Sequence, residues 1–553
     1  MPKAPSDVTS RRAFIQSSSL TLAVGLAARG AAAAAAGNAG SSAPSPPPAA
    51  SGRLFVDADT VYGKVQGLQV TGIRIFKGIP YGAPTGGRNR FMPPRKPAAW
   101  TGVRECLAHG PISPQAPADL RSEYGVMIHW DCQPGGMSED CLTLNVWTPG
   151  LKDGAKRPVL VSFHGGGFTS GSGNALGYDG AQLARVGEVV VITVNHRLGS
   201  FGYLQLTDLG APKEWRFAGV AGIMDLTASL EWVRDNVENF GGDPNNVMIF
   251  GQSGGGAKTS TLLATPAAKG LFHRAAVQSG SLLKFASRER ATQNTELLLK
   301  QLGISKGRIA DLQNLPWQQL LEAHIAVSAG APGLGGTPVL DGEYLTHDAF
   351  DPVAPPESAG VPLIVSTTLE DAALALSNFT LSDNELKTLL DKRYQDKGTD
   401  MLALYRKYYP EKSPYLLQAM MFTDAGFRRS ALKQAELKCA QGHAPVYLYQ
   451  WDWPSPAFGG RYGAVHGLDV AASFHEARDG NDMSRVSEQL SSAWVAFARS
   501  GNPNTPRLPP WPTYDLSTRA TMVFGTPTQL VNDHRGEIRQ FWEHMPAPTG
   551  ILG

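Results

Sequence analysis

The chain has 553 residues, of which 42% are hydrophobic and 18% charged, a composition that excludes an intrinsically disordered protein and allows a large buried core. Fifty basic residues stand against 48 acidic ones, and the formal net charge is +2. This balance gives no electrostatic support for a nucleic acid or a membrane surface as partner. The length would suggest three or four domains, but a single elaborated α/β domain can also reach it.

Residues 1–36 are typical of a signal peptide of the twin-arginine type. Arg11 and Arg12 precede a mildly apolar run at 17–28, and small residues follow this run. A basic segment, a short apolar segment and small residues at the cleavage point make up an export signal, and the paired arginines resemble the twin-arginine class. The alternative is a buried or membrane-spanning helix, but the run is shorter than the ~20 apolar residues that a span requires. We therefore expect cleavage near Ala36 and export to the bacterial periplasm or the medium.

Residues 37–52, rich in Pro and Ala, predict an extended linker, and residues 53–549 are expected to form one domain. No segment after the linker is apolar over enough residues to span a membrane. The four cysteines contain no Cys-x-x-Cys pair, which argues against a zinc site. An oxidising destination would permit disulfides in any of three complete pairings, among Cys106, Cys132, Cys141 and Cys439.

The domain starts with two predicted short strands, at 60–70 and 73–79, and a long stretch rich in Pro and Gly follows them. Five continuous apolar runs then predict strands that are covered on both faces, at 158–163, 189–194, 247–250, 362–365 and 444–449. Apolar residues spaced three and four apart predict helices at 222–239 and 484–499. Strands that alternate with helices indicate an α/β protein with a mostly parallel sheet.

The segment Gly251-Gln252-Ser253-Gly254-Gly255 directly follows one of these predicted strands and leads into a predicted helix. A serine attacks a carbonyl only if its hydroxyl is exposed and near a base, which a sharp turn between strand and helix provides. Glycines on both sides of the serine avoid steric clashes in this strained turn. A serine in an ordinary glycine-rich loop is the alternative, but the strand before and the helix after it favour Ser253 as a nucleophile.

A second glycine-rich segment, His164-Gly165-Gly166-Gly167-Phe168, follows the predicted strand at 158–163. Three glycines allow backbone N–H groups to approach a developing oxyanion and to point at it together. A glycine loop without a ligand is the alternative, and the position of the loop after a central strand disfavours it. His164 itself is expected to be structural, because the base has to come from a segment beyond the serine.

These motifs resemble those of the type-B carboxylesterases, a family that includes cholinesterases and bacterial para-nitrobenzyl esterases. The resemblance extends from about residue 60 to 514 and includes four further motifs: SEDCL at 138–142, NHRL at 195–198, FGGDPN at 240–245 and WVAFARSGNP at 494–503. It implies an α/β-hydrolase fold, with a mostly parallel central sheet covered by helices on both faces and with large loop and helical insertions. It also implies the chain order serine, acid, histidine.

The family's histidine lies in a His-Gly pair followed by an acidic residue, which makes His466, in the segment 466–469, the expected base. The nearby His475 lacks the glycine. The family's acid is usually a glutamate, and here Asp371 occupies its place, directly after Glu370. An aspartate is chemically adequate, because the acid holds the imidazole tautomer and stabilises its charge. Asp371 is therefore the expected acid, Glu370 is its rival, and a solvated surface carboxylate is the third alternative.

The resemblance further implies that the N–H groups of Gly166, Gly167 and Gly254 form an oxyanion hole, and no metal or cofactor is required. The expected function is that of a serine hydrolase that cleaves small-molecule carboxylic esters through an acyl-enzyme intermediate. One triad serves all acyl transfers, so cleavage of amides, carbamates or thioesters is the first alternative. A non-catalytic adhesion or binding homologue is a remote alternative, since such homologues typically lose the nucleophile.

The family usually pairs the cysteine of its Glu-Asp-Cys motif with an upstream cysteine, whose place is taken here by residues 113–115. Cys141 is expected to pair with Cys132 or Cys106 or to remain free, with Cys132–Cys141 as the working assignment. Trp130 lies close to the position of the cation-binding tryptophan of the cholinesterases. Because the surrounding sequence does not match that loop, a packing role is expected for Trp130.

The export hypothesis predicts where the mature chain begins. N-terminal sequencing of the exported protein should place its first residue close to position 37, because the small residues of a cleavage point end there. A mature chain that begins before Arg29 would contradict the hypothesis.

Overall fold

A computed structural model describes most of the expected domain, and the described residues belong to one compact unit, at 54–118, 122–130, 134–330, 334–477 and 481–546. The expected signal peptide at 1–36 and the linker at 37–52 lie outside the described residues. Within the described ranges, no helix has the length and apolar character that crossing a membrane would take.

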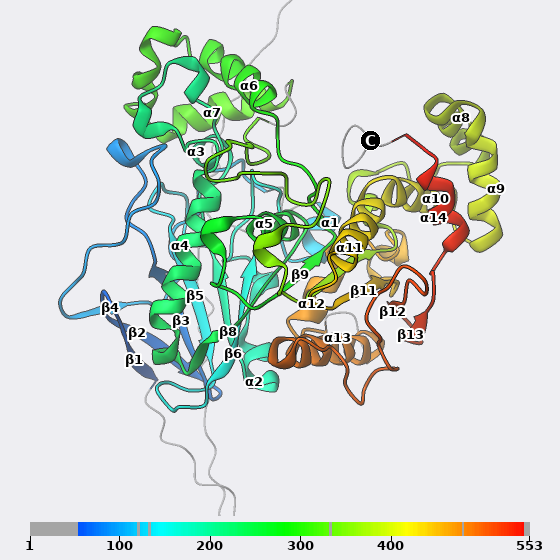
Figure 1. Ribbon diagram of the computed structural model, residues 1–553, viewed down its shortest axis with the longest axis horizontal. Coiled ribbons are helices and arrows are strands. Elements are labelled where there is room, and N and C mark those ends of the chain that lie inside the picture. Colours follow the sequence, from blue (N-terminus) through cyan, green and yellow to red (C-terminus); the bar gives the residue numbers. More distant parts are fainter. Residues whose placement is uncertain (1–53, 119–121, 131–133, 331–333, 478–480, 547–553) are drawn as a thin grey trace, which may run out of the picture. The chain divides into compact units, whose positions relative to one another are not determined.

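Thirteen strands form one sheet at the centre of this unit (Figure 1): β1 (Phe55–Thr60), β2 (Gly63–Val70), β3 (Ile73–Pro80), β4 (Val103–Glu105), β5 (Thr143–Thr148), β6 (Arg157–Phe163), β7 (Val190–Val194), β8 (Gly242–Gln252), β9 (Arg274–Gln278), β10 (Leu363–Thr368), β11 (Val446–Trp451), β12 (Thr521–Phe524) and β13 (Gln529–Val531). Their order is β1-β2-β3-β5-β7-β6-β8-β9-β10-β11-β12-β13, and β4 pairs with β2. From β7 to β12 neighbouring strands run parallel. The strands at the two edges pair mainly antiparallel.

The helices between and after the strands are α1 (Glu123–Met127), α2 (Ala181–Gly187), α3 (Gly199–Gly202), α4 (Ala221–Asn236), α5 (Gly254–Leu263), α6 (Arg288–Gln301), α7 (Trp317–Ser328), α8 (Asp383–Tyr394), α9 (Gly398–Tyr408), α10 (Pro414–Thr423), α11 (Arg429–Gln441), α12 (Leu468–Ser473), α13 (Asn481–Ser500) and α14 (Gly536–Glu543). Two groups of them are helical insertions in the chain. Helices α6 and α7 follow β9, and α8 to α11 lie between β10 and β11.

The central strands are covered on both faces, which explains why their sequences are continuously apolar. Every residue of β6, β7, β10 and β11 is buried. Successive side chains of a strand point to opposite faces, so they enter two different hydrophobic clusters. Val161 of β6 belongs to one cluster together with Leu230 of α4, whereas its neighbour Leu160 belongs to the other together with Trp494 of α13. The helices α4 and α13 therefore cover opposite faces of the sheet.

The five predicted core strands correspond to β6, β7, β8, β10 and β11, and the two predicted helices correspond to α4 and α13, so the predicted α/β-hydrolase architecture is confirmed. The predicted strand at 60–70 is wrong at its start. Residues 61 and 62 form a turn that joins β1 to β2, because Thr60 Oγ1 accepts hydrogen bonds from the N–H groups of Tyr62 and Gly63 and diverts the chain.

Candidate active site

Ser253 lies at the turn between β8 and α5 and has a strained backbone, with φ 59° and ψ −124°. The chain can turn here only because its neighbours lack side chains. A Cβ added at Gly255 would lie 2.0 Å from the carbonyl oxygen of Phe163, and one added at Gly251 would lie 2.5 Å from the backbone of Gly255. Helix α5 starts immediately after the serine, as the sequence predicts. The turn therefore presents the Ser253 hydroxyl at the amino end of a helix.

His466 and Asp371 are brought together from segments almost one hundred residues apart. His466 Nδ1 lies 2.6 Å from Asp371 Oδ1, and both side chains are buried. Asp371 opens a short 3₁₀ turn, η9 (Asp371–Ala375), after β10, whereas His466 follows β11 and precedes α12. Asp371 occupies Nδ1, so Nε2 is the nitrogen of His466 that remains for Ser253. Both Ser253 and His466 line the same cavity.

Asp371 has further hydrogen bonds that hold its carboxylate. Its second oxygen, Oδ2, accepts a hydrogen bond from Ser279 Oγ at 3.0 Å and another from the N–H of Thr368 at 3.0 Å. The ring of Phe427 lies 5.1 Å from the imidazole of His466, centroid to centroid. The sequence reasoning missed Ser279, although its position directly after β9, in Gln278-Ser279-Gly280, was a signal of the same strand-to-turn kind.

The neighbouring carboxylate, Glu370, faces another partner. Its Oε1 pairs with the ammonium group of Lys412, and its Oε2 accepts a hydrogen bond from the N–H of Ala464 at 2.8 Å. Glu370 is fully buried, and its contacts with Lys412 and Ala464 occupy both of its carboxylate oxygens. The structure thus places Asp371, and not Glu370, at the imidazole of His466.

Asp469, the acidic residue of the His-Gly-Leu-Asp segment, lies beneath the site. It accepts hydrogen bonds from the hydroxyl of Tyr449 at 2.8 Å and from the amide of Gln278 at 3.0 Å. Burial, together with the nearby charge of Asp371, raises the pKa of Asp469 to about 6, although these hydrogen bonds oppose the rise. Asp469 of α12 therefore connects this helix to Gln278 of β9 and Tyr449 of β11.

The glycine loop lies against the start of α5. Gly166 and Gly167 have φ values of 82° and 60°, and a Cβ on Gly254 would lie 2.3 Å from the Gly167 nitrogen, so the two backbones are in close contact. The N–H of Gly165 donates to the Tyr178 hydroxyl at 3.0 Å. In the part of the chain that the structure describes, the N–H groups of Gly166, Gly167 and Gly254 have no such acceptor, and all three residues line the cavity with Ser253. These backbone donors are placed to receive an anionic oxygen.

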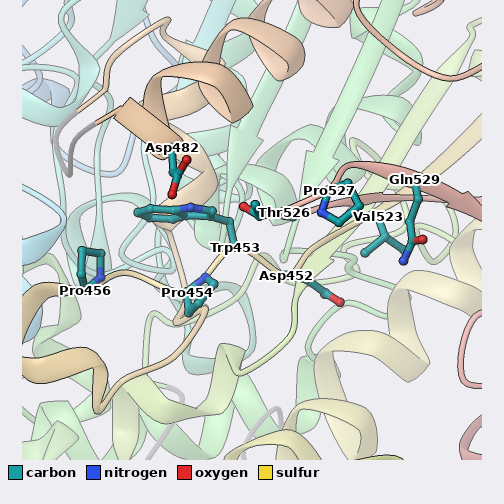
Figure 2. Close-up of a pocket in the computed structure, with 10 residues that line it drawn as sticks. Asp452, Trp453, Pro454, Pro456, Asp482, Val523, Thr526, Pro527 and Gln529 are labelled. Atoms are coloured by element: carbon teal, nitrogen blue, oxygen red, sulfur yellow. The ribbon is translucent and has the colours of Figure 1, made fainter.

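The cavity at Ser253 has a volume of about 410 Å³ and mostly apolar walls, with Trp130, Phe168, Leu282, Leu374 and Phe427 among its lining residues. Trp130 both lines the cavity and packs edge-on against Tyr178, with ring centroids 6.3 Å apart. A separate hollow of about 720 Å³ lies at the ends of β11 and β12, around Trp453, Pro454 and Pro527 (Figure 2). None of the three candidate catalytic residues lines this second hollow.

The described cysteines form no disulfide with one another. Cys141 is a free, fully buried thiol whose pKa is raised by burial, and Cys106 and Cys439 are also free. The expected Cys132–Cys141 disulfide depends on Cys132, which lies outside the described residues, so this pairing stays a prediction. Among the described residues, no group of three or more His, Cys, Asp or Glu side chains is arranged to hold a metal ion.

Behind the glycine loop lies a buried cluster of two histidines and a lysine. His164 and His196 stack with ring centroids 5.0 Å apart, and burial lowers the pKa of each imidazole well below its ordinary value. Lys258 of α5 is fully buried and donates to the carbonyl oxygen of His164 at 2.8 Å. Burial also lowers the pKa of Lys258 well below its ordinary value. His164 is thus structural, as the sequence indicates, and Lys258 ties α5 to the base of the loop.

The lowered pKa of Lys258 predicts how stability depends on pH. The unfolded chain keeps this proton up to the ordinary value of 10.5, whereas burial favours the neutral amine in the folded protein. Between the lowered pKa and 10.5 the unfolded state binds more protons, so this residue makes the free energy of unfolding rise with pH, by at most about 1.4 kcal/mol per pH unit. The variant Lys258→Met should lack this rise.

Urea unfolding at about pH 7, 8.5 and 10 measures the effect. Lys258→Met should gain stability over the natural protein at the lowest of these pH values and lose the advantage toward the highest. Lys269→Met, which changes an exposed lysine, is the matched control and should follow the natural protein. Parallel curves for Lys258→Met and the natural protein would refute the prediction.

Known proteins with similar sequences and structures are esterases and related hydrolases. A model of the carboxylesterase family matches residues 55–542. The para-nitrobenzyl esterase of Bacillus subtilis (strain 168) is 36% identical over 501 residues, covering 87% of this chain and 97% of that protein. The phenmedipham hydrolase of Pseudarthrobacter oxydans is 33% identical over 85% of this chain and 94% of its own length. A solved carboxylesterase structure from Geobacillus stearothermophilus has a TM-score of 0.75 and 34% identity, covering 88% of this chain and 99% of that one.

The match to the family model spans almost all of the described residues, and each relative is covered over nearly its full length. The sheet order, the serine turn and the His466–Asp371 pair lie within the matched region. The chain therefore belongs to the carboxylesterase family and is a serine hydrolase of carboxylic esters with the α/β-hydrolase fold.

Proposed function

We propose that Ser253, His466 and Asp371 form the catalytic triad of this esterase. The observation that carries the proposal is the 2.6 Å contact between Asp371 and His466 Nδ1, beside a cavity that is also lined by Ser253. Asp371 fixes the tautomer in which Nδ1 carries the proton, so Nε2 is free to act as a base. His466 Nε2 takes the proton of Ser253, and Ser253 Oγ attacks the ester carbonyl.

The tetrahedral intermediate places its negative oxygen against the backbone N–H groups of Gly166, Gly167 and Gly254. Collapse of the intermediate breaks the ester C–O bond, and protonated His466 gives its proton to the leaving alcohol. A water molecule then attacks the acyl-enzyme with His466 as base, and the same steps release the acid and restore Ser253. The nucleophile, the base and the N–H donors in these steps are all groups of the chain itself.

The walls of the cavity favour small esters with apolar acyl or alcohol groups, because Trp130, Phe168 and Leu282 bury apolar surface. One relative is named a para-nitrobenzyl esterase, so a para-nitrobenzyl ester is a suitable first substrate. The same triad has the chemistry to open amides, carbamates and thioesters, and a matched ester and anilide with one acyl group separate these activities. Turnover of the ester well above that of the anilide is expected.

A fluorophosphonate probe tests the nucleophile. The natural protein should take up one probe per chain, and mass spectrometry of the digested protein should place it on Ser253, since this serine combines a strained strand-to-helix turn with a histidine in the same cavity. Ser253→Ala should abolish both labelling and hydrolysis of the ester. Ser279→Ala is the matched control, because this serine lies in the same cavity but donates to Asp371, and it should still be labelled at Ser253. Labelling of any other residue would overturn the proposal.

A pair of carboxamide variants tests the acid. Asp371→Asn should lower kcat by about 10³–10⁴, because an amide at this position favours the wrong imidazole tautomer. Glu370→Gln should keep kcat within a few-fold of the natural value, and it should lower the free energy of unfolding by about 1–3 kcal/mol because the ion pair with Lys412 is lost. Steady-state kinetics and urea unfolding on the same samples measure both effects. Near-normal turnover of Asp371→Asn, with a loss in Glu370→Gln, would transfer the role to Glu370.

A further inference from the structure

Another cavity, of about 1080 Å³, adjoins the cavity at Ser253 and is distinct from the hollow around Trp453. The two are lined in common by Ser281, Leu282, Thr337, Gly426 and Ser430, so they meet along these residues. The cavity at Ser253 alone, at about 410 Å³, holds a small ester. A longer substrate whose carbonyl lies at Ser253 therefore has its remaining length to place in the larger cavity.

Part of the lining of the larger cavity is apolar. Leu283 and Phe285 come from the segment after β9, Leu334 from a loop, Leu432 from α11 and Trp542 from α14. Side chains from four separate segments thus line one space, and they would cover a hydrocarbon chain. Figure 1 shows α11 and α14 on the right of the sheet and α6 at the top.

The acidic side chains of this cavity are all neutralised. Asp424 pairs with Arg535 through contacts of 2.8 and 3.0 Å. Glu436 pairs with Arg519, and Glu543 lies 2.6 Å from Arg539. None of the three acids therefore offers an uncompensated negative charge to a ligand.

The basic side chains of the same cavity are more numerous, and three of them have no acidic partner in the described part of the chain. These are Arg290 of α6 and Arg429 and Lys433 of α11. The guanidinium group of Arg429 donates to the Pro546 carbonyl oxygen at 3.0 Å. Arg429 and Lys433 are four residues apart on one helix, so they lie on the same face. The cavity thus combines apolar walls with an excess of positive charge.

We propose that this cavity is a subsite for the anionic end of a long substrate, and that the enzyme prefers esters whose chain ends in a carboxylate, such as monoesters of dicarboxylic acids. The inference rests on the proposed function, because the ester carbonyl has to lie at Ser253. The methylene groups lie along the apolar walls, and the terminal carboxylate reaches Arg290, Arg429 and Lys433. Opposite charges at a partly exposed site raise kcat/KM mainly through faster association, and salt weakens the effect.

Two activated esters that differ only at the far end of the acyl chain test the proposal. Both are 4-nitrophenyl esters with an acyl chain of about six to ten carbons. One chain ends in a carboxylate and the other in a carboxamide. The measured quantity is the ratio of kcat/KM for the carboxylate ester to that for the carboxamide ester. In Arg290→Glu/Lys433→Glu this ratio should fall about tenfold at low salt, and in Arg290→Gln/Lys433→Gln about threefold. Added salt should lower the ratio of the natural protein.

The matched control is Lys156→Glu/Lys269→Glu, which makes the same change in net charge at two exposed lysines outside both cavities. Its ratio should equal that of the natural protein. A ratio that stays within about twofold of the natural value in both Arg290/Lys433 variants would overturn the proposed subsite. In that case, continued hydrolysis of the carboxamide ester would leave the proposed function intact. If the natural protein hydrolyses neither ester, the proposed function itself fails.

Discussion

The active site depends on three backbone segments that meet at the turn between β8 and α5 with no space for a Cβ between them. Gly255 faces the carbonyl of Phe163, Gly254 faces the nitrogen of Gly167, and a Cβ on Gly280 would lie 2.1 Å from the carbonyl oxygen of Ser253. These contacts join the ends of β6, β8 and β9, which are neighbouring strands of the sheet. Because parallel strands end at one edge, the serine, the glycine loop and the segment that carries Ser279 are brought together by the sheet itself. The positive φ of Ser253 is stable only within this close contact.

The same sheet edge separates two adjacent carboxylates. Glu370 and Asp371 are neighbours in sequence and both are fully buried, yet one faces Lys412 and the other faces His466. The 3₁₀ turn η9 begins between them, so their side chains leave the backbone in different directions. A buried carboxylate is costly unless it is paired and hydrogen-bonded. Glu370 contacts Lys412 and the N–H of Ala464, whereas Asp371 contacts His466 and the N–H of Thr368, so each carboxylate has its own set of partners.

The sequence predicted the parts of the site that depend on local chemistry. The Gly-x-Ser-x-Gly turn and the glycine loop are set by nearby backbone geometry, so their positions followed from the residues, whereas His466 was expected from the family resemblance. The preference for Asp371 over Glu370 also rested on that resemblance, because the contacts that hold Glu370 involve Lys412 and Ala464, which lie far away in the chain. The strand β9, with the short sequence RAAVQ, carries too few apolar residues to be recognised, although it supplies Gln278 and positions Ser279.

Burial disfavours the charged forms of the titratable groups behind the glycine loop. His164, His196 and Lys258 are all titratable, but burial lowers the pKa of each one, which favours their neutral forms. A cation at Lys258 would attract the oxyanion, but it would also stabilise any anion in the resting cavity, including a product carboxylate. In the proposed mechanism, fixed N–H dipoles at Gly166, Gly167 and Gly254 act over a shorter distance, so they would favour the tetrahedral intermediate over ligands that are placed less well. In the proposed mechanism the selection of the transition state rests on backbone geometry, which the contacts at the β8–α5 turn hold in place.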